Sequence, residues 1–242
     1  LRCESSFRHA AAEPPRLVYQ QRATQIWSAR ATTALRPRST QTCQTTPRTR
    51  RDGRERYRDE TVQVDLGSGE QFSESFKKIN PDCAVPVLEL DDGSYISEVF
   101  AICHYLETTN PEPPLLGTTD EERARILMWQ AKVEQQGLAA MADAFRNTTK
   151  RMKDHAVTGS VPYAQIPELA ERGRSRVKEF FLKLDQQLAD NEFVAGDSYS
   201  IADITAMVVV DFAAWVKLSL PEDAANVRRW YESVSSRPSA AA

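Results

Sequence analysis

The stretch NPDCAVPVLEL at residues 80–90 decides the fold that this sequence encodes. Asn80-Pro81 ends a short helical segment, because the residue before a proline disfavours helical backbone. Residues 85–90 are then rich in Val and Leu, which is typical of a strand. A proline removes one backbone donor, so Pro86 belongs either to an edge strand or to a fixed turn with a cis peptide bond. The residue pattern alone favours the edge strand, and both options stay open at this point.

The segments on both sides of this stretch predict an α+β part followed by helices. Residues 61–66 predict a half-buried strand, and residues 73–80 a short helix. After a tight turn at residues 91–94, residues 95–96 predict a further strand, and Ser97 is expected to cap the next helix. A proline-rich linker follows at residues 111–118. Beyond it the helical spacing of apolar residues predicts an all-α part, in which residues 200–216 form the most apolar helix.

Residues 1–59 differ in composition from the rest of the chain. They contain 13 Arg, no Lys and five acidic residues, a net charge of +8, and they are rich in Ser, Thr, Gln and Pro. Such a segment buries too little apolar surface to offset its ordering entropy. Three interpretations stay open: a disordered or atypical extension, sequence foreign to the folded protein, or an organelle transit peptide, which has a similar composition.

The remaining residues carry the opposite charge. Because the whole chain has a net charge of −3, residues 60–242 sum to −11, which argues against nucleic acid as the main partner. No apolar run approaches the roughly 20 residues of a membrane helix, so no membrane partner is expected. The four cysteines form no C-x-x-C pair and the chain has three His, so we expect no metal site. Scattered cysteines favour a reducing compartment, so we expect a cytoplasmic protein, or an organellar one if residues 1–59 are a transit peptide.

Three motifs, in this order, resemble those of the glutathione S-transferase superfamily, particularly its bacterial-type members. The first is the stretch at residues 80–88. The second is SEVFAI at residues 97–102, followed by YLE at 105–107, and the third is FVAGD at 193–197, followed by SIADI at 200–204. The resemblance covers about residues 60–242. It implies a partial thioredoxin-like N-terminal domain followed by an all-α helical bundle domain.

The resemblance also implies that Val85, Pro86, Glu98 and Val99 bind glutathione. The family's proline at this position is cis, and it directs the backbone groups of Val85 to the cysteinyl part of glutathione. At Glu98 a helix begins, and its backbone N–H groups suit the γ-glutamyl carboxylate, while the acid side chain suits the ammonium. Val99 stands where the family usually has Ser or Thr. One hydroxyl donor is thereby lost, worth about 1.5–3 kcal/mol to a charged acceptor, which predicts weakened affinity.

Other residues with reactive side chains have a structural interpretation. Ser200 and Asp203 have the spacing of a capping box, so Asp203 is expected to be structural rather than catalytic. His104 is expected on the surface and Cys103 in the core. Cys83, in the loop before Pro86, keeps open the alternative of a reactive thiol.

The catalytic residue of the family is a Tyr, Ser or Cys that stabilises the glutathione thiolate directly after the first strand. Here only residues 17–19 resemble a strand, and residues 23–35 are weakly helical. Either residues 17–19 supply the central strand through a long loop, or that strand is missing and its half-domain is unstable. The length of the loop favours the second alternative. No catalytic residue is assigned, because no position supports the residues with suitable chemistry: Tyr19, Ser28, Cys43 and Tyr57.

The chain is therefore divided into an extension at residues 1–59, a truncated thioredoxin-like glutathione-binding domain at 60–110, a linker at 111–118 and an all-α domain at 119–242. One function that fits is a detoxification enzyme with glutathione as co-substrate. It would conjugate glutathione to small hydrophobic electrophiles, or reduce them with its thiol, as a homodimer whose activity is impaired in this chain. The alternative is a non-catalytic interaction module.

Overall fold

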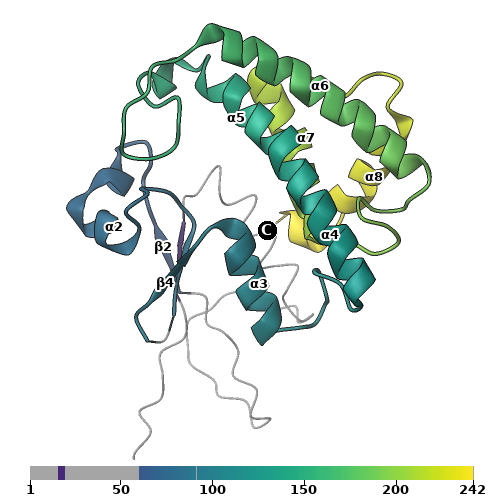
Figure 1. The fold of residues 1–242 in the computed structure, drawn as a ribbon, viewed down its shortest axis with the longest axis horizontal. Coiled ribbons are helices and arrows are strands. Elements are labelled where there is room, and N and C mark those ends of the chain that lie inside the picture. Colours follow the sequence, from purple (N-terminus) through teal and green to yellow (C-terminus); the bar gives the residue numbers. More distant parts are fainter. Residues whose placement is uncertain (1–15, 20–59, 91, 242) are drawn as a thin grey trace, which may run out of the picture.

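The computed structural model describes residues 16–19, 60–90 and 92–241, and its N-terminal part contains a four-stranded sheet (Figure 1). In sheet order the strands are β2 (Glu60–Gln63), β1 (Arg16–Tyr19), β3 (Val87–Glu89) and β4 (Tyr95–Ser97). Strand β1 runs parallel to β2 and antiparallel to β3, and β3 and β4 form an antiparallel pair. The sheet is therefore mixed, with β1 and β3 inside it and β2 and β4 at its edges.

The central position of β1 corrects the sequence analysis. Leu17 pairs with Thr61 on one side and with Leu88 on the other. The preference for a missing central strand is therefore wrong, as is the assignment of all of residues 1–59 to an extension. The connection from β1 to β2, residues 20–59, is long, but the entropy of loop closure grows only slowly with loop length. Residues 1–15 and 20–59, on which the transit-peptide and extension interpretations depend, lie outside the described residues.

The described residues of this N-terminal part include two α-helices. A short 3-10 segment, η1 (Glu70–Phe72), leads into α2 (Glu74–Ile79), and Ser73 caps α2 by accepting a hydrogen bond from the backbone of Phe76 at 3.2 Å. Helix α3 (Val99–Thr109) follows β4 directly. One side of α3 packs on the sheet through Ile102, and the other packs on the C-terminal helices through Cys103. Helix α3 therefore lies between the two halves of the molecule (Figure 1).

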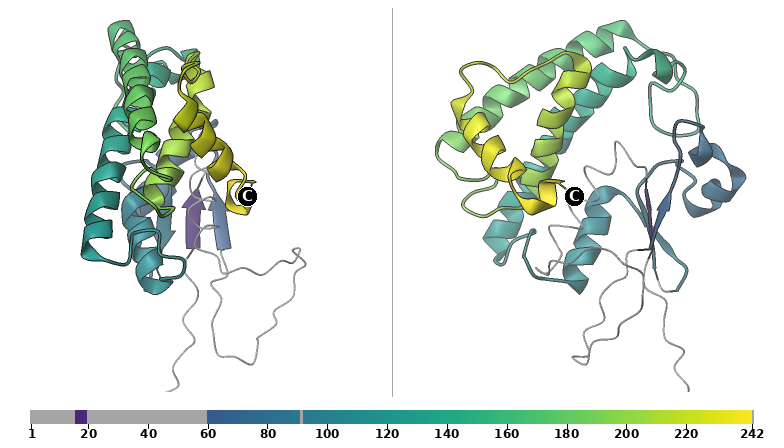
Figure 2. Two further views of the ribbon diagram at one scale, coloured as in Figure 1. Left: turned by 90° about the vertical axis from the view of Figure 1, so that its right-hand side faces the viewer. Right: turned by 180° about the vertical axis from the view of Figure 1, so that it is seen from behind.

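The C-terminal part is helical, and Figure 2 shows it from two further sides. A long rod is formed by α4 (Asp120–Lys132), the π-helical segment η2 (Val133–Leu138) and α5 (Ala139–Arg146). Next come the 3-10 segment η3 (Lys150–Met152), α6 (Pro167–Ala189), α7 (Ile201–Phe212), η4 (Ala213–Val216), α8 (Ala225–Ser235) and η5 (Pro238–Ala241). Within the described ranges, no helix combines the length and the apolar character that crossing a membrane requires.

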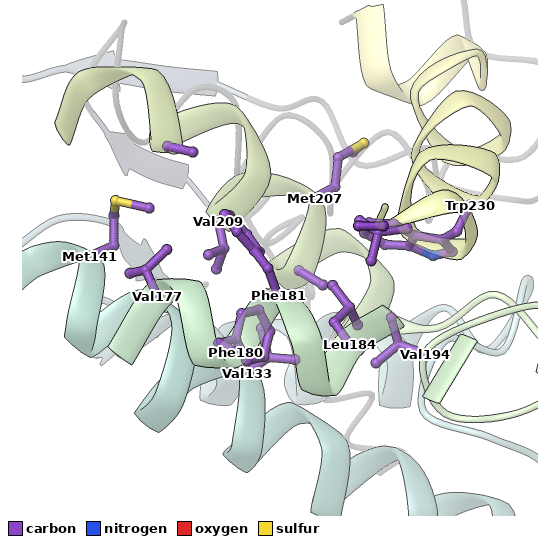
Figure 3. Packing of buried hydrophobic residues seen from close by; sticks show 14 of the residues in the cluster. Val133, Met141, Val177, Phe180, Phe181, Leu184, Val194, Met207, Val209 and Trp230 are labelled. Atoms are coloured by element: carbon purple, nitrogen blue, oxygen red, sulfur yellow. The ribbon is translucent and has the colours of Figure 1, made fainter. Parts of the chain in front are cut away.

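The main core lies between α6, α7 and the α4–α5 rod. Phe180 and Phe181 of α6 are buried between Val133 and Val209, and Trp230 of α8 closes one end (Figure 3). Helix α7 is the most deeply buried helix, as its apolar sequence predicts: nine of its residues are buried. This core fixes α7 in place, and α7 in turn supports α3.

Gly137 and Gly173 let the helices of this core approach closely. A β-carbon at Gly173 would lie 2.6 Å from the carbonyl oxygen of Ala140, and one at Gly137 would lie 3.0 Å from Cγ2 of Val209. Gly137 falls in the π-helical segment η2. Its role is therefore a close contact between helices, in addition to any change in helix direction.

Candidate functional site

The candidate site lies where β3 begins and β4 ends. In the antiparallel pairing, Val87 at the start of β3 stands opposite Ser97 at the end of β4. Val85 and Pro86 precede Val87 directly, and Glu98 and Val99 follow Ser97 directly. The register therefore brings all four sequence-predicted glutathione residues to one place, here called the β3–α3 junction (Val85, Pro86, Glu98 and Val99).

The peptide bond between Val85 and Pro86 is cis, so the prediction of a fixed cis turn is confirmed and the edge-strand alternative is excluded. Strand β3 is an inner strand, with β1 on one side and β4 on the other. Pro86 is buried and Val85 is half-buried. Val85 packs against the apolar cluster of Val64, Phe76 and Val87.

Asn80 holds the loop that leads into this turn, a role that sequence reasoning missed. Its side chain is buried; Nδ2 donates to the carbonyl oxygen of Ala84 at 2.8 Å, and Oδ1 accepts from the backbone N–H of Asp82 at 3.1 Å. An Asn side chain that bonds backbone two residues on is a known turn device, and the Asn-Pro pair is its only signal in the sequence. The buried Asn80 side chain thus fixes the conformation of the loop that precedes Val85.

Glu98 is the N-cap residue of α3, which corrects the prediction that Ser97 caps this helix. Ser97 remains in β4 because it pairs with Val87. Glu98 has φ 66° and ψ 122°, a backbone conformation that L residues rarely adopt, and its exposed side chain makes no capping hydrogen bond. Rare conformations of this kind cost about 1–3 kcal/mol and cluster at functional sites. The uncapped N–H groups and the dipole of α3 favour an anion at this point.

Val99 begins α3, and its half-buried side chain packs against the apolar cluster that contains Cys103 and Val208. The side chain thus helps to join α3 to α7. It offers no hydroxyl group to a ligand, so only the backbone N–H of residue 99 can donate at this position.

Ser200 and Asp203 form the predicted capping box at the start of α7. Asp203 is fully buried and accepts four hydrogen bonds: Oδ1 accepts from Val194 N and Trp230 Nε1, both at 2.8 Å, and Oδ2 from Ser200 N and Ser200 Oγ, both at 2.9 Å. Burial raises the pKa of Asp203, although these four donors act in the opposite direction. The network links α7, α8 and the loop before α7, so the residue is structural.

Three other reactive side chains that the sequence singles out belong to the described part of the chain: His104, Cys103 and Cys83. His104 is exposed on α3, and Cys103 is buried, as predicted. Burial, together with the nearby charges of Glu107 and Glu134, raises the pKa of Cys103 to about 12. Cys83 is buried, with Sγ 3.5 Å from the carbonyl oxygen of Pro81. Since both thiols are buried, neither has the exposed, electropositive surroundings of a reactive cysteine.

No catalytic donor is assigned from the sequence, and the four residues with suitable chemistry are Tyr19, Ser28, Cys43 and Tyr57. Tyr19 ends β1, whereas Ser28, Cys43 and Tyr57 lie outside the described residues. Within the described part of the chain, no group of His, Cys, Asp and Glu side chains is arranged to hold a metal ion.

Comparisons with known proteins agree with the architecture. Residues 56–109 match the profile "Glutathione S-transferase, N-terminal domain", and residues 132–238 match "Glutathione S-transferase, C-terminal domain". Glutathione S-transferase 2 of Saccharomyces cerevisiae is 35% identical over 181 residues, which is 74% of each chain. The disulfide-bond oxidoreductase YfcG of Escherichia coli is 30% identical over 73% of this chain and 79% of its own. The crystal structure of Gtt2 from Saccharomyces cerevisiae superposes with a TM-score of 0.76 at 29% identity, covering 93% of this chain and 98% of that one.

Proposed function

Because this chain belongs to the glutathione S-transferase family, we propose that it binds glutathione at the β3–α3 junction and transfers it to a small hydrophobic electrophile. The observation that carries this proposal is the register of β3 against β4, in which Val87 pairs with Ser97, so that Val85 and Glu98 lie at the same end of this strand pair. Glutathione needs backbone pairing for its cysteinyl part and a polar, charged environment for its γ-glutamyl end, and the two residues offer these groups at that end.

In this proposal the chain's own groups hold the tripeptide in a fixed orientation. The backbone N–H and C=O of Val85 pair with the cysteinyl residue of glutathione. The uncapped N–H groups at the start of α3 bind the γ-glutamyl carboxylate, since a helix N-terminus favours an anion. The exposed carboxylate of Glu98 accepts hydrogen bonds from the γ-glutamyl ammonium. Holding the thiol in one orientation is the first requirement for its attack on an electrophile.

An aromatic group in the C-terminal part supports an apolar electrophile as the second substrate. Phe212 and Trp215 stack with ring centroids 4.3 Å apart at 13°, and Phe145 tilts against Trp215 at 5.6 Å. Phe212 packs against the same apolar cluster as Val99, so this aromatic trio (Phe145, Phe212 and Trp215) lies toward the start of α3. Trp215 is 47% exposed, which leaves indole surface for a planar apolar molecule.

No residue is named in this proposal as the group that activates the glutathione thiol. In the family this donor follows the first strand, so it is expected after Tyr19, among residues that the structure does not describe. The electrophile is attacked by the thiolate, whose formation depends on that donor. A thiol-dependent reduction at the same junction is the related reaction, and the similarity to an oxidoreductase keeps it within the proposal. We further propose a cytoplasmic homodimer, as is typical of the family.

Retention on immobilised glutathione, followed by a conjugation assay with a model electrophile, tests the proposal. We expect the chain to be retained and the variant Glu98→Ala to bind about tenfold more weakly, because a charge-assisted hydrogen bond of about 1.5 kcal/mol is lost. Glu192→Ala, which removes an exposed carboxylate elsewhere, is the matched control and should bind normally. Retention with turnover supports the enzyme, retention without turnover supports impaired catalysis, and no retention supports the non-catalytic module.

A further inference from the structure

The loop between α5 and α6, residues 147–166, reaches from the C-terminal part to the N-terminal part. It lies beside α2 in two opposite views (Figures 1 and 2). The imidazole ring of His155 stacks on the phenyl ring of Phe72 in η1, with centroids 5.3 Å apart and an interplanar angle of 20°. A β-carbon at Gly159 would lie 3.8 Å from the carbonyl oxygen of Asp82, in the loop after α2. The loop therefore contacts the chain both before and after α2.

Hydrogen bonds brace this loop against its own half of the molecule. Nη1 of Arg146, the last residue of α5, donates to the carbonyl oxygen of His155 at 3.0 Å. The side chain of Gln165 donates to the carbonyl oxygens of Arg146 at 2.6 Å and Thr149 at 2.9 Å, and the Asn147 side chain accepts from Ile166 N at 2.9 Å. The position of His155 is thus set by α5, and a displacement of Phe72 would have to break the ring stack.

Two buried polar atoms, one in His155 and one in the residue before Phe72, have no hydrogen-bond partner. Oε1 of Gln71, the residue before Phe72, and Nδ1 of His155 are the two buried side-chain atoms of the described residues that lack a hydrogen-bond partner. Nδ1 belongs to the ring that stacks on Phe72, and Gln71 is the chain neighbour of Phe72 within η1. Buried polar groups are normally paired, because leaving one unpaired costs free energy. An interdomain contact that retains two such atoms is easier to open than the apolar core, and segments that open readily are those used in ligand binding.

We infer that residues 147–166 form an interdomain strap and that His155 is a positioning residue. Through its stack on Phe72, His155 holds the segment η1–α2 in place, and through that segment the loop of Asn80 to Ala84 that sets the position of Val85. This inference rests on the proposed function for its effect on glutathione, whereas the mechanical coupling between the halves stands independently.

Amide hydrogen exchange of the apo protein tests the coupling. In His155→Ala we expect exchange in residues 70–79 to rise about fivefold, the opening expected when one aromatic pair is lost, while exchange in α6 stays unchanged. His155→Phe keeps a ring on Phe72 and should restore the slow exchange. Phe72→Leu removes the ring from the opposite side with little loss of apolar volume and should resemble His155→Ala. Val161→Ala, at an exposed position of the same loop, is the control and should match the wild type.

Unchanged exchange in residues 70–79 of both His155→Ala and Phe72→Leu would overturn the strap. Failure of His155→Phe to restore slow exchange would overturn the ring stack as its cause. Calorimetric titration with glutathione gives the functional readout: the Kd of His155→Ala should rise severalfold and that of His155→Phe should not. If the wild type fails to bind glutathione at all, the proposed function fails, and the exchange data still decide whether the strap exists.

Discussion

Replacing Asp203 by Ala should destabilise the fold by about 3–5 kcal/mol. The carboxylate accepts four hydrogen bonds, from Val194 N, Trp230 Nε1, Ser200 N and Ser200 Oγ. Hydrogen bonds to a charged group contribute about 1.5–3 kcal/mol each, so the gross loss is roughly 6–12 kcal/mol. Burying a carboxylate costs several kcal/mol, and the substitution removes that cost. The net loss is the gross loss minus this burial cost. It is a large fraction of the free energy of unfolding of a typical domain, which is about 5–15 kcal/mol.

Replacing Asp203 by Asn separates charge from hydrogen bonding at the same volume. The amide oxygen can keep Val194 N and Trp230 Nε1, while the NH₂ group can donate to Ser200 Oγ. One buried donor, Ser200 N, is then left unpaired at a cost of about 1–3 kcal/mol. Because the burial cost of the charge disappears too, Asp203→Asn should lose no more than about 2 kcal/mol.

Equilibrium unfolding in urea, followed by tryptophan fluorescence to which the buried Trp230 contributes, measures both variants. Asp197→Asn, at a nearby exposed position, is the control. The control should lie within about 0.5 kcal/mol of the wild type. If Asp203→Ala loses less than about 1 kcal/mol, or Asp203→Asn loses more than Asp203→Ala, the network is not the source of stability that this reasoning assigns to it.

The other predictions concern glycine contacts, a buried acid and the two proposed substrates. A β-carbon at Gly173 would lie 2.6 Å from the Ala140 backbone, and one at Gly137 would lie 3.0 Å from a Val209 methyl. Gly173→Ala should therefore lower the free energy of unfolding by about 2–3 kcal/mol, and Gly137→Ala by about 1 kcal/mol. An equal loss for the two variants in urea titration would contradict this order. Burial raises the pKa of Glu107, whose oxygens accept from the backbones of residues 115 and 116. Its contribution to stability is therefore full below the unfolded pKa of about 4.3 and lost as pH rises through the folded pKa. The free energy of unfolding of Glu107→Gln, measured as pH rises from the unfolded pKa of about 4.3, should lack this decline. A decline as steep as that of the wild type would contradict the reasoning. Val99→Ser should tighten glutathione binding about tenfold by calorimetry, because a hydroxyl donor is gained, and Trp215→Ala should raise the KM of an aromatic electrophile severalfold while leaving that of glutathione unchanged.

Much of the fold follows from local patterns in the sequence. The capping box at Ser200 and the buried helix α7 each depend on residue types within a few positions, and both are present. The cis turn at Pro86 is present too, but the residue pattern alone favours an edge strand there, and only the resemblance to the family implies the cis bond. The expected positions of Cys103 in the core and of His104 on the surface follow from residue type and from the place in the helix, and both are found.

The misplaced elements depend on pairing between distant segments. Strand β1 has the sequence RLVY, which is too short for a periodic signal and stands in polar surroundings. Only its pairing with Thr61 and Leu88 makes it a strand. Ser97 is a better N-cap than Glu98 by residue preference, but its pairing with Val87 keeps it in β4 and moves the cap to Glu98. The role of Asn80 and the stack of His155 on Phe72 likewise need tertiary structure to be seen.

The strand order separates the segment proposed to bind glutathione from the segment proposed to activate its thiol. The pairing of β3 with β4 brings Val85 and Glu98 to the same end of this hairpin, which lies within residues 85–99. Strand β1 completes the sheet from the other side of β3 and contributes no residue to the β3–α3 junction. In the family, by contrast, the thiol donor follows the first strand. The proposed glutathione site and the proposed activation of its thiol therefore come from separate segments, so changes in residues 20–59 should affect turnover while leaving the affinity for glutathione largely intact.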